Sequence, residues 1–97
     1  MAKTQHFNVI CVAADTEYEV PLIRTNTVRR IGLHFRAAAA GKYGWVKKSV
    51  NTASPVGPYF TLDAGVTRDI ELEDGNVQLF VASPTLGAVL EVEVIYN

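Results

Sequence analysis

Apolar and polar residues alternate along most of this chain, in short runs of the kind that form β-strands. The last run shows the pattern most cleanly. One of its faces carries Leu90, Val92, Val94 and Tyr96, and the other carries Glu91, Glu93 and Ile95. This period of two residues predicts a strand with one buried face and one solvated face.

The remaining runs bring the expected number of short strands to about eight, and no amphipathic helix interrupts them. The predicted strands cover residues 6–13, 16–22, 28–37, 43–50, 59–62, 67–72, 76–83 and 88–96. Strands at spacings of roughly ten residues favour an all-β fold. We therefore expect residues 1–97 to form one domain, an antiparallel β-sandwich or small barrel with a jelly-roll or immunoglobulin-like layout.

The first predicted strand has apolar residues in both phases. One face carries Phe7, Val9 and Cys11, and the other carries Ile10 and Val12. Such a run predicts a strand that is buried on both sides. Cys11 is the only cysteine, so no intramolecular disulfide can form, and we expect it to be a small buried hydrophobic residue rather than a reactive thiol.

The predicted strand at residues 28–37 contains a break in phase. Its inward positions are Ile31, Leu33, Phe35 and Ala37. Val28 does not share their phase, so we expect a β-bulge near Arg29 and Arg30. Proline donates no hydrogen bond to a ladder, so either the preceding strand, which contains Pro21, lies at a sheet edge or the Pro21 nitrogen faces solvent.

Glycine and proline mark the connections between the predicted strands. Residues 51–58 contain two prolines and a glycine, which predicts a loop. Ala64-Gly65 predicts a turn. Glu73-Asp74-Gly75-Asn76 predicts the tip of a hairpin between strands 67–72 and 76–83.

Charge is segregated along the chain, although the net charge is only −1. Seven of the nine basic residues lie between residues 24 and 48, and no acidic residue occurs between Glu19 and Asp63. One interpretation is that basic and acidic strands lie side by side and pair within the chain. A second is that a basic face meets the acidic face of a neighbouring subunit, where charge complementarity sets orientation.

Nucleic-acid binding is a third interpretation of the basic window. Tyr43 and Trp45 stand beside lysines, which resembles a platform for stacking bases. However, the near-neutral chain has no recognisable nucleic-acid-binding motif, so we expect neither nucleic acid nor a membrane as a partner.

Residues that could carry chemistry are sparse. His6 and His34 are the only histidines, and no Gly-x-Ser-x-Gly nucleophile elbow, zinc-ligand spacing or phosphate-binding glycine loop occurs. The first residues, MAKTQHFNV, lack an apolar signal segment, and no run approaches the length of a transmembrane helix. We therefore expect a protein that is not an enzyme and that uses no cofactor and no metal.

The acidic run 69–75 allows two interpretations. Asp69, Glu71 and Glu73 occupy alternate positions, as in a calcium-binding loop, and Gly75 follows one place later than that loop requires. Apolar residues fill the intervening positions, which is typical of a half-buried strand. Its carboxylates would lie roughly 6–7 Å apart, too far to share one ion, so we favour the strand.

The segment FTLDAGVTRDIELEDGNVQLFVASPTLGAVLEVEV, residues 60–94, resembles the C-terminal part of small virion proteins of tailed bacteriophages. The features that carry the resemblance are Leu62-Asp63-Ala64-Gly65, the strand Leu79-Phe80-Val81-Ala82-Ser83, the turn at Gly87 and a last strand rich in Val and Glu. The resemblance implies a structural virion protein, above all a capsid decoration or cement protein that binds and stabilises the major capsid lattice as an oligomer. It also implies synthesis in the host cytoplasm, residence in the virion, partners among the capsid or other virion subunits, and a homotrimer as the favoured assembly.

For such a module we expect arginines and aromatic residues to anchor the contact surface. The predicted contact residues are Arg29, Arg30, Arg36, Tyr43, Trp45, Lys47, Lys48, Pro55 and Pro58. Two alternative functions stay open. One is a tail- or fibre-associated module, and the other is a carbohydrate-binding β-sandwich in which Tyr43, Trp45 and Tyr59 form an exposed aromatic platform.

Overall fold

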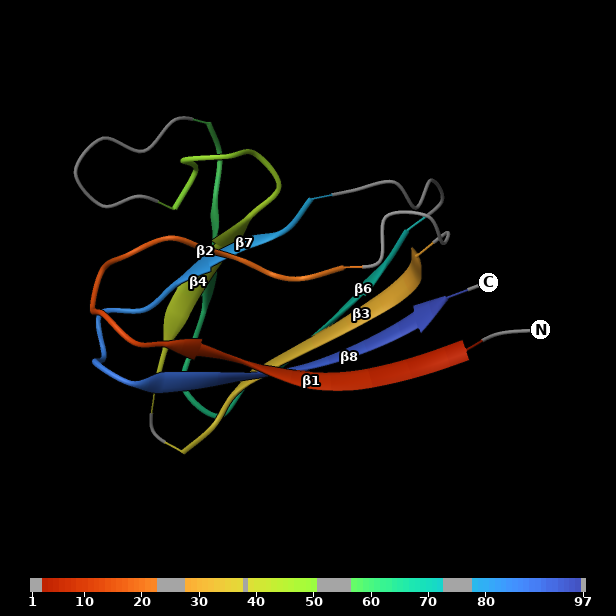
Figure 1. Cartoon of the computed structure of the whole chain (residues 1–97), viewed down its shortest axis with the longest axis horizontal. Coiled ribbons are helices and arrows are strands. Elements are labelled where there is room, and N and C mark those ends of the chain that lie inside the picture. Colours follow the sequence, from red (N-terminus) through yellow and green to blue (C-terminus); the bar gives the residue numbers. More distant parts are fainter. Residues whose placement is uncertain (1–2, 23–27, 38, 51–56, 73–77, 97) are drawn as a thin grey trace.

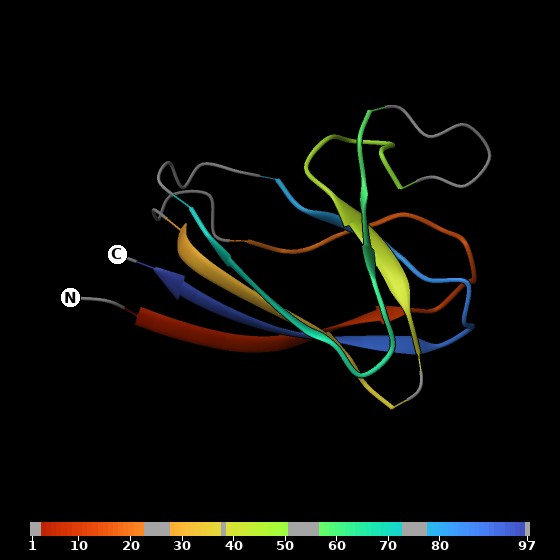
Figure 2. The ribbon, with the colours of Figure 1, turned by 180° about the vertical axis from the view of Figure 1, so that it is seen from behind.

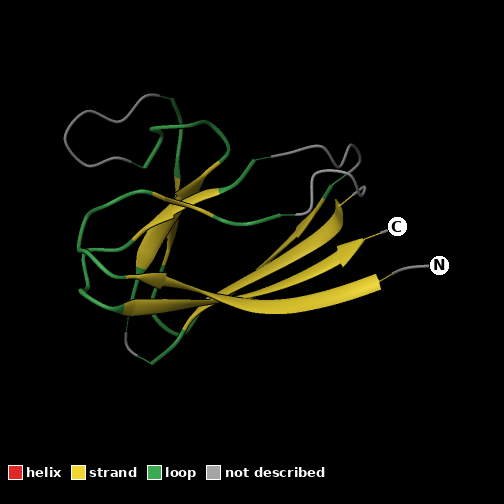
Figure 3. Ribbon diagram, in the orientation of Figure 1, coloured by secondary structure: helices red, strands yellow, loops and turns green. Residues whose placement is uncertain are grey.

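The computed structural model describes residues 3–22, 28–37, 39–50, 57–72 and 78–96 (Figure 1). Within these ranges the chain forms eight strands in two antiparallel sheets, joined by loops and turns (Figure 3). These residues include no helix that is long and apolar enough to cross a membrane. The expected fold class, an all-β antiparallel sandwich, is confirmed.

The two sheets differ in the length of their strands. The long sheet contains, in spatial order, β1 (Lys3–Cys11), β8 (Ala88–Tyr96), β3 (Val28–Phe35) and β6 (Thr67–Glu71). The short sheet contains β2 (Tyr18–Glu19), β7 (Phe80–Ala82), β4 (Gly41–Gly44) and β5 (Phe60–Leu62). The strands of the short sheet run across those of the long sheet, as the views from the front and from behind both show (Figures 1 and 2).

One buried apolar cluster joins the two sheets. The long sheet contributes Val9, Cys11, Val28, Ile31, Leu33, Phe35, Leu90, Val92, Val94 and Tyr96, and the short sheet with its flanks contributes Val20, Tyr43, Leu62, Leu79 and Val81. Burying a side chain of this size stabilises the fold by about 1.5–3 kcal/mol relative to leaving it in water. The alternation predicted for β8 is confirmed, since Leu90, Val92, Val94 and Tyr96 are all buried.

The predicted alternation of buried and exposed residues in the long strands is correct except at Ala37 and on the outer face of β1. The register of β3 against β8 shifts between Val28 and Arg30, so the predicted bulge is confirmed. The inward position predicted for Ala37 is wrong, because Ala37 is exposed and lies in a turn with φ of 60°. Burial of β1 on both faces is also wrong, since Ile10 and Val12 are 56% and 67% exposed and no described element covers that face.

Two further predictions about connections are corrected. The predicted strand at 43–50 ends at Gly44, and residues 45–50 form bends and a turn. Strands β6 and β7 belong to different sheets, so they do not form a hairpin with each other, and the predicted tip at 73–76 lies outside the described residues. Local pattern identifies a strand and a turn, but sheet membership depends on which apolar faces meet in three dimensions.

Gly41, the first residue of β4, is packed between the Phe35 ring of the long sheet and the backbone of β7. A Cβ atom at this position would stand 2.6 Å from the Phe35 ring and would also overlap the Ala82 carbonyl oxygen. Neither a buried ring nor a strand backbone can yield easily. The position therefore requires a residue without a side chain.

We expect Gly41→Ala to lower the free energy of unfolding by about 1–3 kcal/mol, because the added methyl group overpacks the core. Denaturant-induced unfolding would measure this change. Gly32→Ala, in β3 of the long sheet, is the control. Its Cβ would meet Asp69 Oδ1 at 3.2 Å, the end of an exposed side chain that can move. Equal losses in the two variants would contradict the packing described for Gly41.

Candidate functional site

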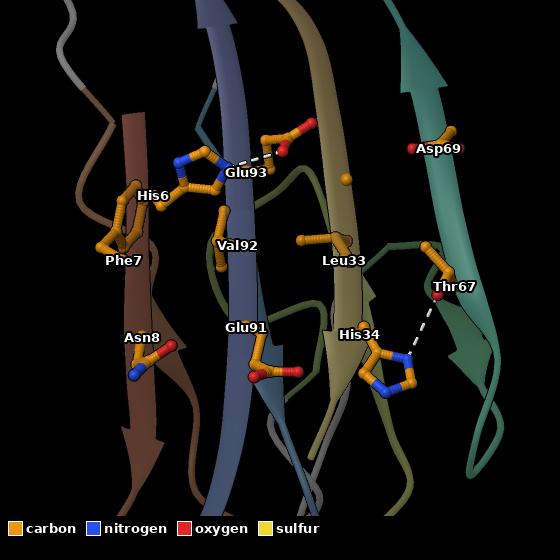
Figure 4. A pocket seen from close by; sticks show the side chains of 11 residues that line it. His6, Phe7, Asn8, Leu33, His34, Thr67, Asp69, Glu91, Val92 and Glu93 are labelled. Atoms are coloured by element: carbon orange, nitrogen blue, oxygen red, sulfur yellow. Dashed lines mark hydrogen bonds and ion pairs between the residues drawn. The ribbon is translucent and has the colours of Figure 1, made fainter. Parts of the chain in front are cut away.

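The outer face of the long sheet is polar and is organised in rows that cross all four strands. Cα partners place His6, Glu93, Gly32 and Asp69 in one row and Asn8, Glu91, His34 and Thr67 in the next. Gly32 contributes no side chain, so the face is hollowed above it. The resulting shallow hollow has a volume of about 290 Å³ and is lined by residues of both rows (Figure 4).

Basic and acidic groups on this face contact one another within the chain. The contacts from side-chain nitrogen to carboxylate oxygen are Arg30–Asp69 at 3.3 Å, Arg36–Glu91 at 3.3 Å and His6–Glu93 at 2.6 Å. All six side chains are roughly half exposed or more, so each contact adds only about 0–1 kcal/mol to stability. The interpretation that basic and acidic strands pair within the chain is confirmed for Arg30 and Arg36.

Among the described residues that line the hollow, His34 and Thr67 form a contact that resembles a base beside a nucleophile. His34 Nδ1 lies 3.3 Å from Thr67 Oγ1 and also 3.3 Å from the Val66 carbonyl oxygen. A protonated Nδ1 would donate to the carbonyl oxygen, whereas an unprotonated Nδ1 would accept the Thr67 hydroxyl proton, so the tautomer decides which of the two hydrogen bonds forms. With either tautomer, the contact links the His34 side chain of β3 to the start of β6.

The carboxylates of β6 point outward along an exposed strand. Asp69 and Glu71 are both exposed, and Glu73 lies outside the described residues. The part of the chain that the structure describes contains no group of three or more His, Cys, Asp or Glu side chains placed to hold a metal ion. The strand interpretation of the acidic run is confirmed for its residues 69–71, which lie in β6.

Cys11 lies at the end of β1 and is fully buried. Burial raises the pKa of the Cys11 thiol, because the charged thiolate loses its solvation. A thiol that is buried and protonated is a poor nucleophile. The expectation that Cys11 serves as a small hydrophobic residue of the core is confirmed.

The aromatic residues proposed as a platform are divided between core and surface. Tyr43 is only 4% exposed, and its ring stacks on Phe60 at 5.4 Å and meets the half-buried Trp45 edge-on at 6.2 Å. Tyr43 therefore cannot belong to an exposed platform. The exposed rings are Tyr59 and Phe60, each 45% exposed, and Lys42 Nζ lies 4.8 Å from the centre of the Tyr59 ring.

The remaining predicted contact residues belong to three different segments of the chain. Arg29 is exposed on β3, Lys47 and Lys48 are exposed in the turn after β4, and Pro58 is exposed before β5. Pro55 lies outside the described residues. A role for these residues at an interface stays a prediction.

The turn that carries Lys47 and Lys48 is held by a carboxylate from a distant segment. The side chain of Glu17 accepts one backbone N–H from Lys48 at 2.9 Å and another from Val50 at 3.2 Å. Lys48 adopts a φ of 70°, a conformation that non-glycine residues rarely take without support. Glu17 thus ties the loop before β2 to the turn after β4.

We expect Glu17→Ala to lower the free energy of unfolding by about 1–3 kcal/mol, because two backbone donors lose a charged acceptor. Glu17→Gln keeps one acceptor oxygen and should lose about half as much. Thermal unfolding would measure both. Asp63→Ala is the control, because this carboxylate is exposed and the described hydrogen bond of Asp63 is made by its backbone carbonyl. If Asp63→Ala lowered the free energy of unfolding as much as Glu17→Ala, the effect would come from the loss of surface charge alone.

Sequence reasoning missed a group of exposed apolar side chains at one end of the long sheet. We call this group the apolar end; it comprises the exposed Ile10, Val12 and Leu86 together with the half-buried Val89. Ile10 pairs with Val89 across β1 and β8, and the Gly87 N–H donates to the Cys11 carbonyl at 2.9 Å, which holds the Leu86 turn beside Val12. Leu86 is 74% exposed. The sequence feature that could have indicated this group is Leu86, an apolar residue next to the glycine of a predicted turn.

A second hollow adjoins the apolar end. It has a volume of about 350 Å³ and is lined by small and apolar residues around Leu86 together with Arg36. No family model, curated protein or solved structure matches this chain.

Proposed function

We propose that this chain is a structural interaction module and that it serves as a capsid decoration protein of a tailed bacteriophage, binding the major capsid lattice as an oligomer. The phage setting rests on the resemblance of residues 60–94. The interaction role rests on the apolar end, where Ile10, Val12 and Leu86 are each more than half exposed. The Ile10–Val89 pair and the hydrogen bond from Gly87 to Cys11 bring the two segments that carry them side by side.

The apolar end is a better contact surface than the charged face of the long sheet. Arg30 and Arg36 already contact Asp69 and Glu91 at 3.3 Å, so a partner that used these arginines would have to replace existing pairs. Large apolar side chains grouped on a surface gain free energy when a partner excludes water from them. The adjoining hollow offers a partner a concave surface into which an apolar side chain could insert.

The location on a particle is the first test of this proposal. Antibodies raised against the purified chain are expected to label the head surface of phage particles from a lysate in which the chain is made. Gold-labelled electron microscopy would record the position. Label confined to the tail would favour the tail- or fibre-associated alternative, and particles that carry no label would contradict a virion role.

The contact surface is tested by Leu86→Asp, which should reduce binding to capsids at least tenfold in a co-sedimentation assay while leaving the melting temperature unchanged. The side chain is 74% exposed, so its replacement should not disturb the core. Val66→Asp is the matched control, an exposed apolar residue in the turn between β5 and β6. Equal binding by the parent chain and Leu86→Asp would show that capsid contact lies elsewhere.

A further inference from the structure

The two sheets have four edges, and three of them are short or charged. At the edges of the short sheet, β2 has two residues and β5 has three. At one edge of the long sheet, β6 has five residues and exposes Arg68, Asp69 and Glu71. Arg68 pairs with the inward-facing Leu33, so it places a charge on the inner side of that edge. Short strands and charges of this kind are how β-proteins prevent pairing between edges.

The fourth edge, β1, has none of these protections. It has nine residues, all in unbroken register with β8, and no described strand lies on its other side. It contains neither proline nor glycine, and its only lysine or arginine is Lys3 at the first position. Figure 1 shows β1 along the margin of the long sheet. A long, regular and nearly uncharged edge is a template for another strand.

The backbone groups that β1 presents can be identified from hydrogen bonds elsewhere in the sheet. Arg36 donates its backbone N–H to the Val89 carbonyl, so the backbone N–H and C=O groups of Val89 point to β3. Those of the next residue, Leu90, then point to β1. Leu90 pairs with Val9, whose backbone groups therefore face β8. The Cys11 carbonyl, two residues on, accepts the Gly87 N–H on that same side.

Because backbone groups point to opposite sides at successive residues, the directions for the rest of β1 follow. The backbone groups of Phe7, like those of Val9, point to β8, and those of Thr4, His6 and Asn8 point away from the sheet. Ile10 faces outward as well, but its carbonyl already accepts the Val12 N–H at 3.0 Å. The free part of the edge is therefore centred on His6 and Asn8, with Phe7 between them.

We propose that β1 pairs antiparallel with β1 of a second copy of this chain, around a two-fold axis at Phe7, so that two long sheets become one continuous eight-stranded sheet. In this register, His6 of each copy exchanges backbone hydrogen bonds with Asn8 of the other. The two Phe7 side chains face each other as a pair without mutual backbone hydrogen bonds, where side chains approach most closely.

The side chains of β1 favour a copy of the same chain as the occupant. Phe7 is only partly buried by the core, so part of its ring remains for a partner to cover. The two-fold axis brings Phe7 against Phe7, Gln5 against Val9 and His6 against Asn8, so no two carboxylates or ammonium groups oppose each other. An isologous pair of this kind uses a single surface twice and closes on itself.

The pairing is independent of the capsid proposal, because it needs no other protein. The apolar end lies at the Cys11 end of β1, so the two-fold axis sends the apolar ends of the two copies to opposite ends of the dimer. A two-fold pair does not produce the homotrimer that the phage resemblance implies. The mass in solution therefore distinguishes the two assemblies without any capsid present.

Light scattering after gel filtration should give a mass twice the 10.6 kDa of one chain across the micromolar range. A single-chain mass, or a three-chain mass, would overturn the two-fold pair. Asn8→Pro removes an outward N–H and leaves the hydrogen bonds to β8 intact, so it should shift the mass to that of one chain with an unchanged circular dichroism spectrum.

Glu71→Pro is the matched control on the opposite edge. Leu72 donates its N–H to the Arg29 carbonyl, so the Glu71 backbone groups face away from β3. This variant should remain a dimer. If Asn8→Pro remained a dimer, or if Glu71→Pro dissociated to the same degree, the assignment to the β1 edge would be overturned.

A second variant decides the register even if proline disturbs folding. Paired residues without mutual hydrogen bonds have Cα atoms about 4.5 Å apart, within the range that a disulfide spans. Mild oxidation of Phe7→Cys should therefore yield a covalent dimer linked through position 7, identified by mass spectrometry of the digest. Asp69→Cys on β6 should stay unlinked, and failure of Phe7→Cys to link would rule out the two-fold axis at this residue.

Discussion

The packing of the apolar face of the long sheet against the short sheet is the constraint on which the other features depend. β8 has a neighbour on each side, and its inward residues, from Leu90 to Tyr96, are buried. A strand has a side-chain period of two, so fixing this face also fixes the opposite one. Because the alternate residues of β8 face the core, Glu91 and Glu93 lie on the outer face. The same alternation along β3 places His34 and Arg36 beside them.

The pairing of charges follows from this packing and does not cause it. Basic residues of β3 and acidic residues of β8 and β6 are far apart in sequence, and they meet because β3 lies between those two strands. Exposed pairs of this kind contribute little free energy each. They do penalise other registers, since a slip of one residue would turn Arg30 or Glu91 toward the core.

The surfaces available to a partner are the ones that internal packing does not use. The outer face of the long sheet pairs several of its own charges, whereas the apolar end and the β1 edge have groups that nothing among the described residues covers. The two surfaces differ in chemistry. The apolar end offers area for burial, while the β1 edge offers backbone hydrogen bonds, whose geometry restricts the partner to an extended strand.

The alternation of β8, the bulge at the start of β3 and the turn at Ala64-Gly65 could be predicted from sequence, because each depends on the chemistry of a few neighbouring residues. Sequence alone therefore determined the all-β class, the inward faces of β3 and β8 and the role of Cys11. Only the tertiary structure decided that Ile10 and Val12 are exposed, that Tyr43 is buried and that β6 and β7 belong to different sheets. The physical reason is that an apolar residue is buried only if another layer covers it, and that layer comes from a distant part of the chain.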